Sequence, residues 1–146
     1  SSPGLGVACR PPHTRGPDVP YISQKDRPRA STEPGTVGEL NYAMTAAFVL
    51  YLKDKGLSYQ TVNDVADAVE TVVQALLVLP LQVSGADEGL AAVLFALVRR
   101  FEHNDPRGGT GAAGALRCAL LEFYHRVAVP YERLKCAVNG DVYLLT

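Results

Sequence analysis

Residues 40–52 constrain the fold more than any other part of the chain, because only Asn41 and Thr45 are clearly polar in this run. Residues 36–39 (TVGE) precede it and have the pattern of a capping box, which satisfies free backbone N–H groups at a helix start. Gly56 follows it and is typical of a helix end. A helix that is apolar on nearly all sides lies at the centre of a fold or in an oligomer interface. We therefore expect one helix over residues 40–52, buried on most faces and partly by another subunit.

Apolar residues at spacings of three and four predict two further helices. Ser58 is a good N-cap for the first of them, and Pro80 ends its pattern near residue 79. Acidic residues 87–88 suit the start of the next helix, which runs to Phe101. The short apolar core of this second segment leaves a buried strand as the alternative.

The last part of the chain predicts a fourth and a fifth helix. Thr110 is a candidate N-cap for the fourth, and Pro130 is expected to break or kink it. The fifth helix then runs over residues 131–138 and ends at the Asn-Gly pair 139–140. Residues 141–146 form a short tail of strand-like residue types.

The region before residue 36 differs in composition, because seven of the ten prolines lie there. Proline disfavours helix interiors and central strands, so we expect an extended or disordered arm over residues 1–35 without helix or sheet. The apolar residues 19–22 could anchor this arm to the body. Residues 36–146 then form the helical domain, and the predicted fold class is an all-α bundle of four to five helices.

Charge and size exclude several functional classes. The chain has 146 residues, the length of one ordinary domain, and its 14 basic and 15 acidic residues give a net charge of −1. A general nucleic-acid or anionic-membrane binder would need a basic excess. The apolar stretch 89–98 is far shorter than the roughly 20 residues that span a bilayer. With no apolar run typical of a signal peptide at the start of the sequence, we expect a cytoplasmic protein.

Cysteine and histidine do not indicate a metal or a catalytic centre. The three cysteines (Cys9, Cys118 and Cys136) are an odd number without C-x-x-C spacing, and the three histidines are far apart in sequence. These spacings predict neither a disulfide framework nor a transition-metal site. Reduced, buried thiols are the expectation.

Two motifs leave other chemistry open. Residues 109–114 read G-x-G-x-x-G, but no strand precedes them, so a flexible helix entry is expected; a phosphate held by these amides beside Arg107 is the alternative. Asp64, Asp67 and Glu70 share one helix face and are expected to be solvated. With a second facing row of carboxylates they could bind Mg²⁺, as in helical nucleotide pyrophosphohydrolases; otherwise no cofactor is expected.

Aromatic and charged residues gather near the C-terminus, where the predicted bends bring successive helices together. Glu122 and Arg126 have the i, i+4 spacing of a helix ion pair, and tyrosine and arginine are common anchors at binding surfaces. We expect any ligand or partner site here, with some of Asn41, Tyr42 and Tyr59 facing it. The full candidate set is Asn41, Tyr42, Tyr59, Glu122, Tyr124, Arg126, Tyr131, Glu132, Lys135, Asn139, Asp141 and Tyr143.

Several short blocks together resemble a family of small uncharacterised proteins of bacteriophages, prophages and bacteria. They are VPYI (19–22), GELNYA (38–43), LSY (57–59), NDV (63–65), LEFY (121–124), RVAVPYE (126–132) and NGDVY (139–143). In that family the NDV block runs almost directly into the LEFY helix, whereas about fifty residues intervene here. The resemblance implies a small helical accessory protein and leaves catalysis open.

These observations predict a non-enzymatic, homo-oligomeric interaction or ligand-binding protein, derived from a phage or prophage. The alternatives are the Mg²⁺-dependent hydrolase and a virion or assembly subunit whose proline-rich arm reaches a neighbour. The expected partners are further copies of the chain, a protein or a small polar ligand.

Overall fold

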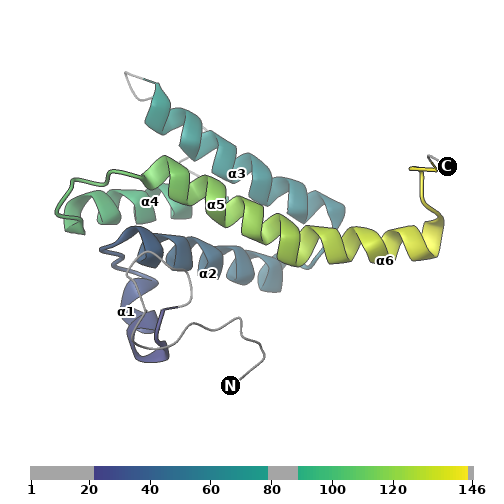
Figure 1. The fold of residues 1–146 in the computed structure, drawn as a ribbon, viewed down its shortest axis with the longest axis horizontal. Helices are drawn as coiled ribbons and strands as arrows, with labels where there is room; N and C mark the ends of the chain where they lie inside the picture. Colours follow the sequence, from purple (N-terminus) through teal and green to yellow (C-terminus); the bar gives the residue numbers. More distant parts are fainter. Residues whose placement is uncertain (1–21, 79–88, 145–146) are drawn as a thin grey trace.

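The computed structural model describes residues 22–78 and 89–144, and every regular element in these ranges is helical (Figure 1). This confirms the predicted all-α fold, and the strand alternative for the third helix is wrong. In chain order the elements are η2 (Gln24–Asp26), α1 (Arg27–Ala30), α2 (Val37–Lys55), α3 (Tyr59–Leu77), α4 (Gly89–Asn104), α5 (Ala112–Phe123), η3 (Tyr124–Ala128) and α6 (Val129–Asn139).

Helices α2 to α5 form a four-helix bundle. α2 packs against α4 and α5, and α3 packs against the same two helices. The consecutive helices α2 and α3 therefore lie on one diagonal of the bundle, while α4 and α5 lie on the other. None of the described helices is long and apolar enough to cross a membrane.

The core fills the space between these four helices with aliphatic and phenyl side chains. Each helix contributes an inward stripe at spacings of three and four, and burying one such side chain is worth about 1.5–3 kcal/mol. Phe48 of α2 and Phe123 of α5 meet edge to face, with ring centroids 5.5 Å apart. The most buried members are Leu40, Met44, Phe48, Val65, Val69, Val72, Val73, Leu94, Val98, Phe101 and Leu116.

The predicted helix starts at Thr36 and Ser58 are confirmed. The Thr36 hydroxyl accepts a hydrogen bond from the Glu39 amide at 3.1 Å, and the Ser58 hydroxyl accepts one from the Thr61 amide at 3.1 Å. Gly56 ends α2 with φ of 87°, a positive angle that residues with a Cβ rarely adopt. Residues 79–88 lie outside the described residues. They include Pro80, which was expected to end the second helix, and the acidic residues 87–88, which were expected to begin the third.

The prediction that nothing helical precedes Thr36 is wrong for residues 22–35. η2 and α1 form there because Pro28 occupies the first turn of α1, where its missing N–H costs no hydrogen bond. Arg29 of α1 then binds the Glu39 carboxylate on α2, with Nη1 3.0 Å from Oε1. Ile22 is buried, as expected of an anchor, and residues 1–21 lie outside the described residues.

Helix α5 begins differently from its prediction. Thr110 does not cap it, because the Thr110 hydroxyl donates to the carbonyl of Arg107 at 2.9 Å. Gly111 precedes the helix instead and adopts φ of 97°. The glycines of this segment therefore serve the turn between α4 and α5, as the expected flexible helix entry requires.

The expectation of buried thiols is wrong, and the strand-like residues of the C-terminal tail form a turn. Residues 141–144 form no strand; the Asp141 carboxylate accepts from the Tyr143 amide at 2.8 Å and holds a local turn there. Cys118 and Cys136 are exposed rather than buried, because both lie on outward faces of α5 and α6. Cys9 lies outside the described residues.

Candidate functional site

Pro130 does not break the chain into two helices. α5, η3 and α6 continue as one rod, and α6 projects beyond the bundle (Figure 1). Proline lacks an N–H and its ring clashes with the carbonyl four residues earlier. The backbone widens just before it into a π-turn, in which the Val129 amide donates to the Tyr124 carbonyl five residues earlier. Such turns place side chains at registers that an α-helix does not offer, and they are frequent at functional sites.

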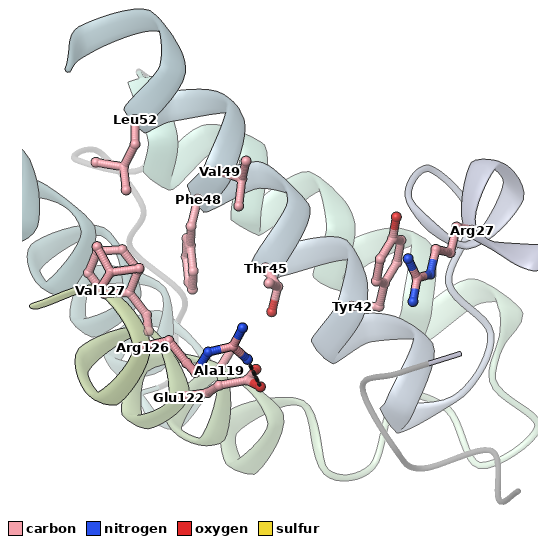
Figure 2. A pocket seen from close by; sticks show the side chains of 11 residues that line it. Arg27, Tyr42, Thr45, Phe48, Val49, Leu52, Ala119, Glu122, Arg126 and Val127 are labelled. Carbon is pink, nitrogen blue, oxygen red and sulfur yellow. Dashed lines mark ion pairs between the residues drawn. The ribbon is translucent and has the colours of Figure 1, made fainter. Parts of the chain in front are cut away.

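A pocket of about 240 Å³ lies on one side of this turn, between α2 and α5 (Figure 2). We call it the α2–α5 pocket. Its walls are apolar and come from both helices and from η3, and polar side chains stand only at its edge. The lining residues are Arg27, Tyr42, Thr45, Phe48, Val49, Leu52, Ala119, Glu122, Phe123, Arg126 and Val127.

The edge of this pocket has more positive than negative charge. Arg126 Nη1 lies 3.8 Å from Glu122 Oε2, so the predicted i, i+4 ion pair is confirmed. Figure 2 shows this pair facing Thr45, with Arg27 beside Tyr42. The Arg27 guanidinium is 5.6 Å from the centre of the Tyr42 ring, a cation–π contact. Two guanidinium groups against one carboxylate leave the described edge with a net charge of +1.

A second hollow of about 500 Å³ lies beside the start of α3. We call it the tyrosine hollow, and it shares no lining residue with the α2–α5 pocket. Tyr124 Oη donates to Glu132 Oε2 at 3.2 Å across it, and this hydrogen bond to a carboxylate raises the pKa of Tyr124. Its lining residues are Tyr59, Gln60, Val62, Asn63, Ala66, Tyr124 and Glu132.

The structure distributes the candidate residues over three places. Tyr42, Glu122 and Arg126 line the α2–α5 pocket, and Tyr59, Tyr124 and Glu132 line the tyrosine hollow. Tyr42 and Tyr59, which are distant from the C-terminal segment in sequence, thus do face it. The remaining candidates, which line neither cavity, are Asn41, Tyr131, Lys135, Asn139, Asp141 and Tyr143.

Three of these remaining residues have local roles. Lys135 lies 5.5 Å from the centre of the Tyr131 ring on the outer surface of α6. Asn41 is buried in α2, and its Oδ1 has no hydrogen-bond partner within the described part of the chain. Its backbone carbonyl accepts from the Thr45 hydroxyl at 2.9 Å, one turn closer to the α2–α5 pocket.

Sequence reasoning missed the residues that complete both cavities. Arg27 belongs to a segment that was expected to be an extended arm, and no local pattern relates it to Tyr42. Phe48 and Leu52 were expected only as core residues of the central helix. Gln60 and Asn63 belong to the polar face of α3, whose proximity to Tyr124 depends on how α5 crosses α3.

The acidic row on α3 binds its own neighbours. Asp64 accepts from the Tyr51 hydroxyl at 2.8 Å and from the Gln60 amide group at 2.8 Å. Asp67 accepts from Asn63, and Glu70 from Gln74, each one turn away on the same face. Within residues 22–78 and 89–144, no three His, Cys, Asp or Glu side chains lie close enough to hold a metal ion.

The backbone amide of Gly109, the first glycine of the G-x-G-x-x-G segment, is not free to bind a phosphate. The Gly109 amide donates to the Asp105 carboxylate at 2.9 Å, and Asp105 is itself buried. Arg107 lies 4.0 Å from the same carboxylate group. The loop is therefore organised around Asp105.

Comparisons with protein-family models, with curated proteins and with solved structures find no match to this chain.

Proposed function

We propose that this chain is a non-enzymatic helical binding protein whose α2–α5 pocket takes a small apolar acid. The observation that carries the proposal is an apolar pocket with an arginine-bearing edge. Phe48, Leu52 and Val127 would contact the apolar part of the ligand, and Arg126 and Arg27 would attract its carboxylate.

The size of the pocket supports a small ligand. About 240 Å³ exceeds the roughly 150 Å³ of a cavity that holds benzene, and it is below the roughly 300 Å³ of the smallest drug-sized pockets. One aromatic ring or a short alkyl chain fits this space. The acid group would then remain at the edge, where Arg126 is more than half exposed and keeps part of its hydration.

The charge at the edge supports an anion over a cation. A carboxylate there would be a further acceptor for Arg126 beside Glu122, and Arg27 would stabilise the added charge from the Tyr42 side. Arginine suits this role because its planar group donates to a carboxylate through two parallel N–H groups.

The test is calorimetric titration with 4-phenylbutyrate, alongside its neutral analogue 4-phenyl-1-butanol and its cationic analogue 4-phenylbutylamine. We expect the acid to bind at least about tenfold more tightly than the alcohol, because a hydrogen bond to a charged group is worth about 1.5–3 kcal/mol. Arg126→Gln should remove this advantage. Arg133→Gln, which changes an arginine on α6 outside the pocket, is the matched control and should keep it.

Two results contradict this function. One is equal binding of the acid and the alcohol, and the other is an acid advantage that persists in Arg126→Gln. A pocket-filling variant, Val49→Trp at the partly exposed edge, should abolish binding of all three compounds if they enter the pocket.

The other expectations stay predictions. They are self-association, a cytoplasmic location, a phage or prophage origin and kinship with the resembled family. The hydrolase and the virion subunit remain alternatives that no described contact favours.

A further inference from the structure

The tyrosine hollow combines two aromatic rings with one carboxylate. Tyr59 at the start of α3 is 69% exposed, and Tyr124 on η3 is 45% exposed. Glu132 on α6 completes the hollow beside Tyr124. Both rings are therefore accessible to a ligand that enters the hollow.

Glu132 is the one charged residue among the described lining residues, so the hollow has a negative charge. It accepts a hydrogen bond from Tyr124, and no lysine or arginine of the described chain lies within ion-pair distance of it. A carboxylate with its second oxygen left to solvent can attract a cation.

The neighbouring amides are polar but uncharged. Gln60 donates its amide N–H to Asp64, and Asn63 donates its own to Asp67. Each amide keeps its oxygen, which is an acceptor, and one further N–H, and neither group carries a charge. No described residue that lines the hollow carries a positive charge that would repel a cation.

We propose that the tyrosine hollow binds an organic cation, a methylated ammonium group held against the rings of Tyr59 and Tyr124 with Glu132 as its counter-charge. Cations bind the negative faces of aromatic rings, and quaternary ammonium groups are the usual ligands of such aromatic sites. A methylated ammonium suits the hollow better than a bare one, because it is weakly hydrated and contacts rings without giving up strong hydrogen bonds to water.

This inference is independent of the acid-binding function. The two cavities have no residue in common, and their described charges are of opposite sign, +1 at the α2–α5 pocket and −1 at the tyrosine hollow. Choline therefore tests the hollow alone, and 4-phenylbutyrate tests the pocket alone.

The experiment is a two-dimensional amide NMR titration with choline and with its neutral isostere 3,3-dimethylbutan-1-ol. We expect choline to shift the amide signals of Tyr59, Asn63 and Tyr124 in a saturable way. The isostere has the same shape without the charge, so it loses the cation–π attraction. It should bind at least about fivefold more weakly, because a cation–π contact worth about 1 kcal/mol corresponds to a factor of about five in affinity.

Variants assign the effect to named groups. Glu132→Gln removes the counter-charge and Tyr59→Leu removes one aromatic ring. Each should weaken choline binding at least about fivefold. Glu70→Gln and Tyr131→Leu are matched controls, because these residues are partly or largely exposed on α3 and α6 and do not line the hollow. Both controls should bind choline as the unchanged protein does. Circular dichroism of each variant checks that the helices are intact.

A second arm identifies the source of the ammonium group. N-acetyl-trimethyllysine amide is titrated beside choline and beside unmethylated N-acetyl-lysine amide. Tighter binding of the trimethyllysine derivative assigns the hollow to a modified side chain of a protein, and tighter binding of choline assigns it to a free small amine. Equal binding of choline and the isostere, or shifts that map away from Tyr59 and Tyr124, would overturn the proposal.

Discussion

Replacing single glycines in the turn between α4 and α5 separates backbone strain from steric clash. Gly109 has φ of 89°, and a methyl group added to it would lie 2.5 Å from Glu102 Cγ and 3.0 Å from Glu102 Cα. Gly108 next to it has φ of 70° with open space around it. Gly114, inside α5, has ordinary helical geometry and open space. The three alanine variants therefore differ in one physical factor at a time.

The expected changes in the free energy of unfolding follow from these environments. Gly108→Ala should lose about 1–2 kcal/mol, the cost of a left-handed conformation for a residue with Cβ. Gly109→Ala should lose that amount and a further 1–3 kcal/mol or so, because the backbone of Glu102 has to move away from the new methyl group. Gly114→Ala should gain about 0.5–1 kcal/mol, since alanine restricts the unfolded chain and favours the helix.

Urea denaturation followed by circular dichroism measures all three values, provided that the slope against urea stays constant. Gly109→Ala that is as stable as Gly108→Ala would refute the contact with Glu102. Gly114→Ala that destabilises the protein would refute its assignment to open helical space. A larger loss for Gly109→Ala than for Gly108→Ala would also mean that the close contact with Glu102 is enough to require a glycine at the first position of the G-x-G-x-x-G motif, without a bound phosphate.

Two further predictions concern acid stability and self-association. Arg29 holds the pKa of Glu39 below its usual value of 4.5 by hydrogen bonding, so this pair stabilises the fold above that pH and the stabilisation is lost as the pH falls through the lowered pKa. The stability difference between the unchanged protein and Glu39→Gln should therefore shrink from about pH 7 to about pH 3, and a constant difference contradicts this role. Leu50 is 67% exposed beside an apolar hollow of about 520 Å³ between α2 and α4, which a second copy of the chain would cover. Sedimentation equilibrium should give a dimer or larger species that Leu50→Glu converts to monomer, and a monomeric unchanged protein would contradict it.

Helices that depend on local signals were predictable from the sequence. The 3-and-4 spacing of the valines over residues 62–73 requires one buried helix face, and α3 buries that face. Thr36, Ser58 and Gly56 act through hydrogen bonds and backbone angles of their immediate neighbours, so their roles follow from position alone. The i, i+4 relation of Glu122 and Arg126 is equally local.

Features that depend on distant contacts were not predictable. The π-turn before Pro130 adds one residue to a turn instead of ending the helix, and this choice depends on how η3 packs against the bundle. The contact of Arg27 with Tyr42 needs α1 to fold back onto α2, which the many prolines of the arm argued against. Tyr59 and Tyr124 are more than sixty positions apart, and only the crossing of α5 over α3 brings them to one hollow.

Because α6 projects beyond the bundle, η3 is the pivot about which a bend of the chain would move the far end of α6. α6 has 11 residues, so it extends about 16 Å beyond the pivot at 1.5 Å per residue. A bend of roughly 20° at the pivot, the size at which a helix kink is recognised, would carry the far end of α6 about 6 Å sideways. Both cavities are lined by residues of η3, so a ligand that bent the chain there would move the C-terminal end of α6 several times further than the cavity walls.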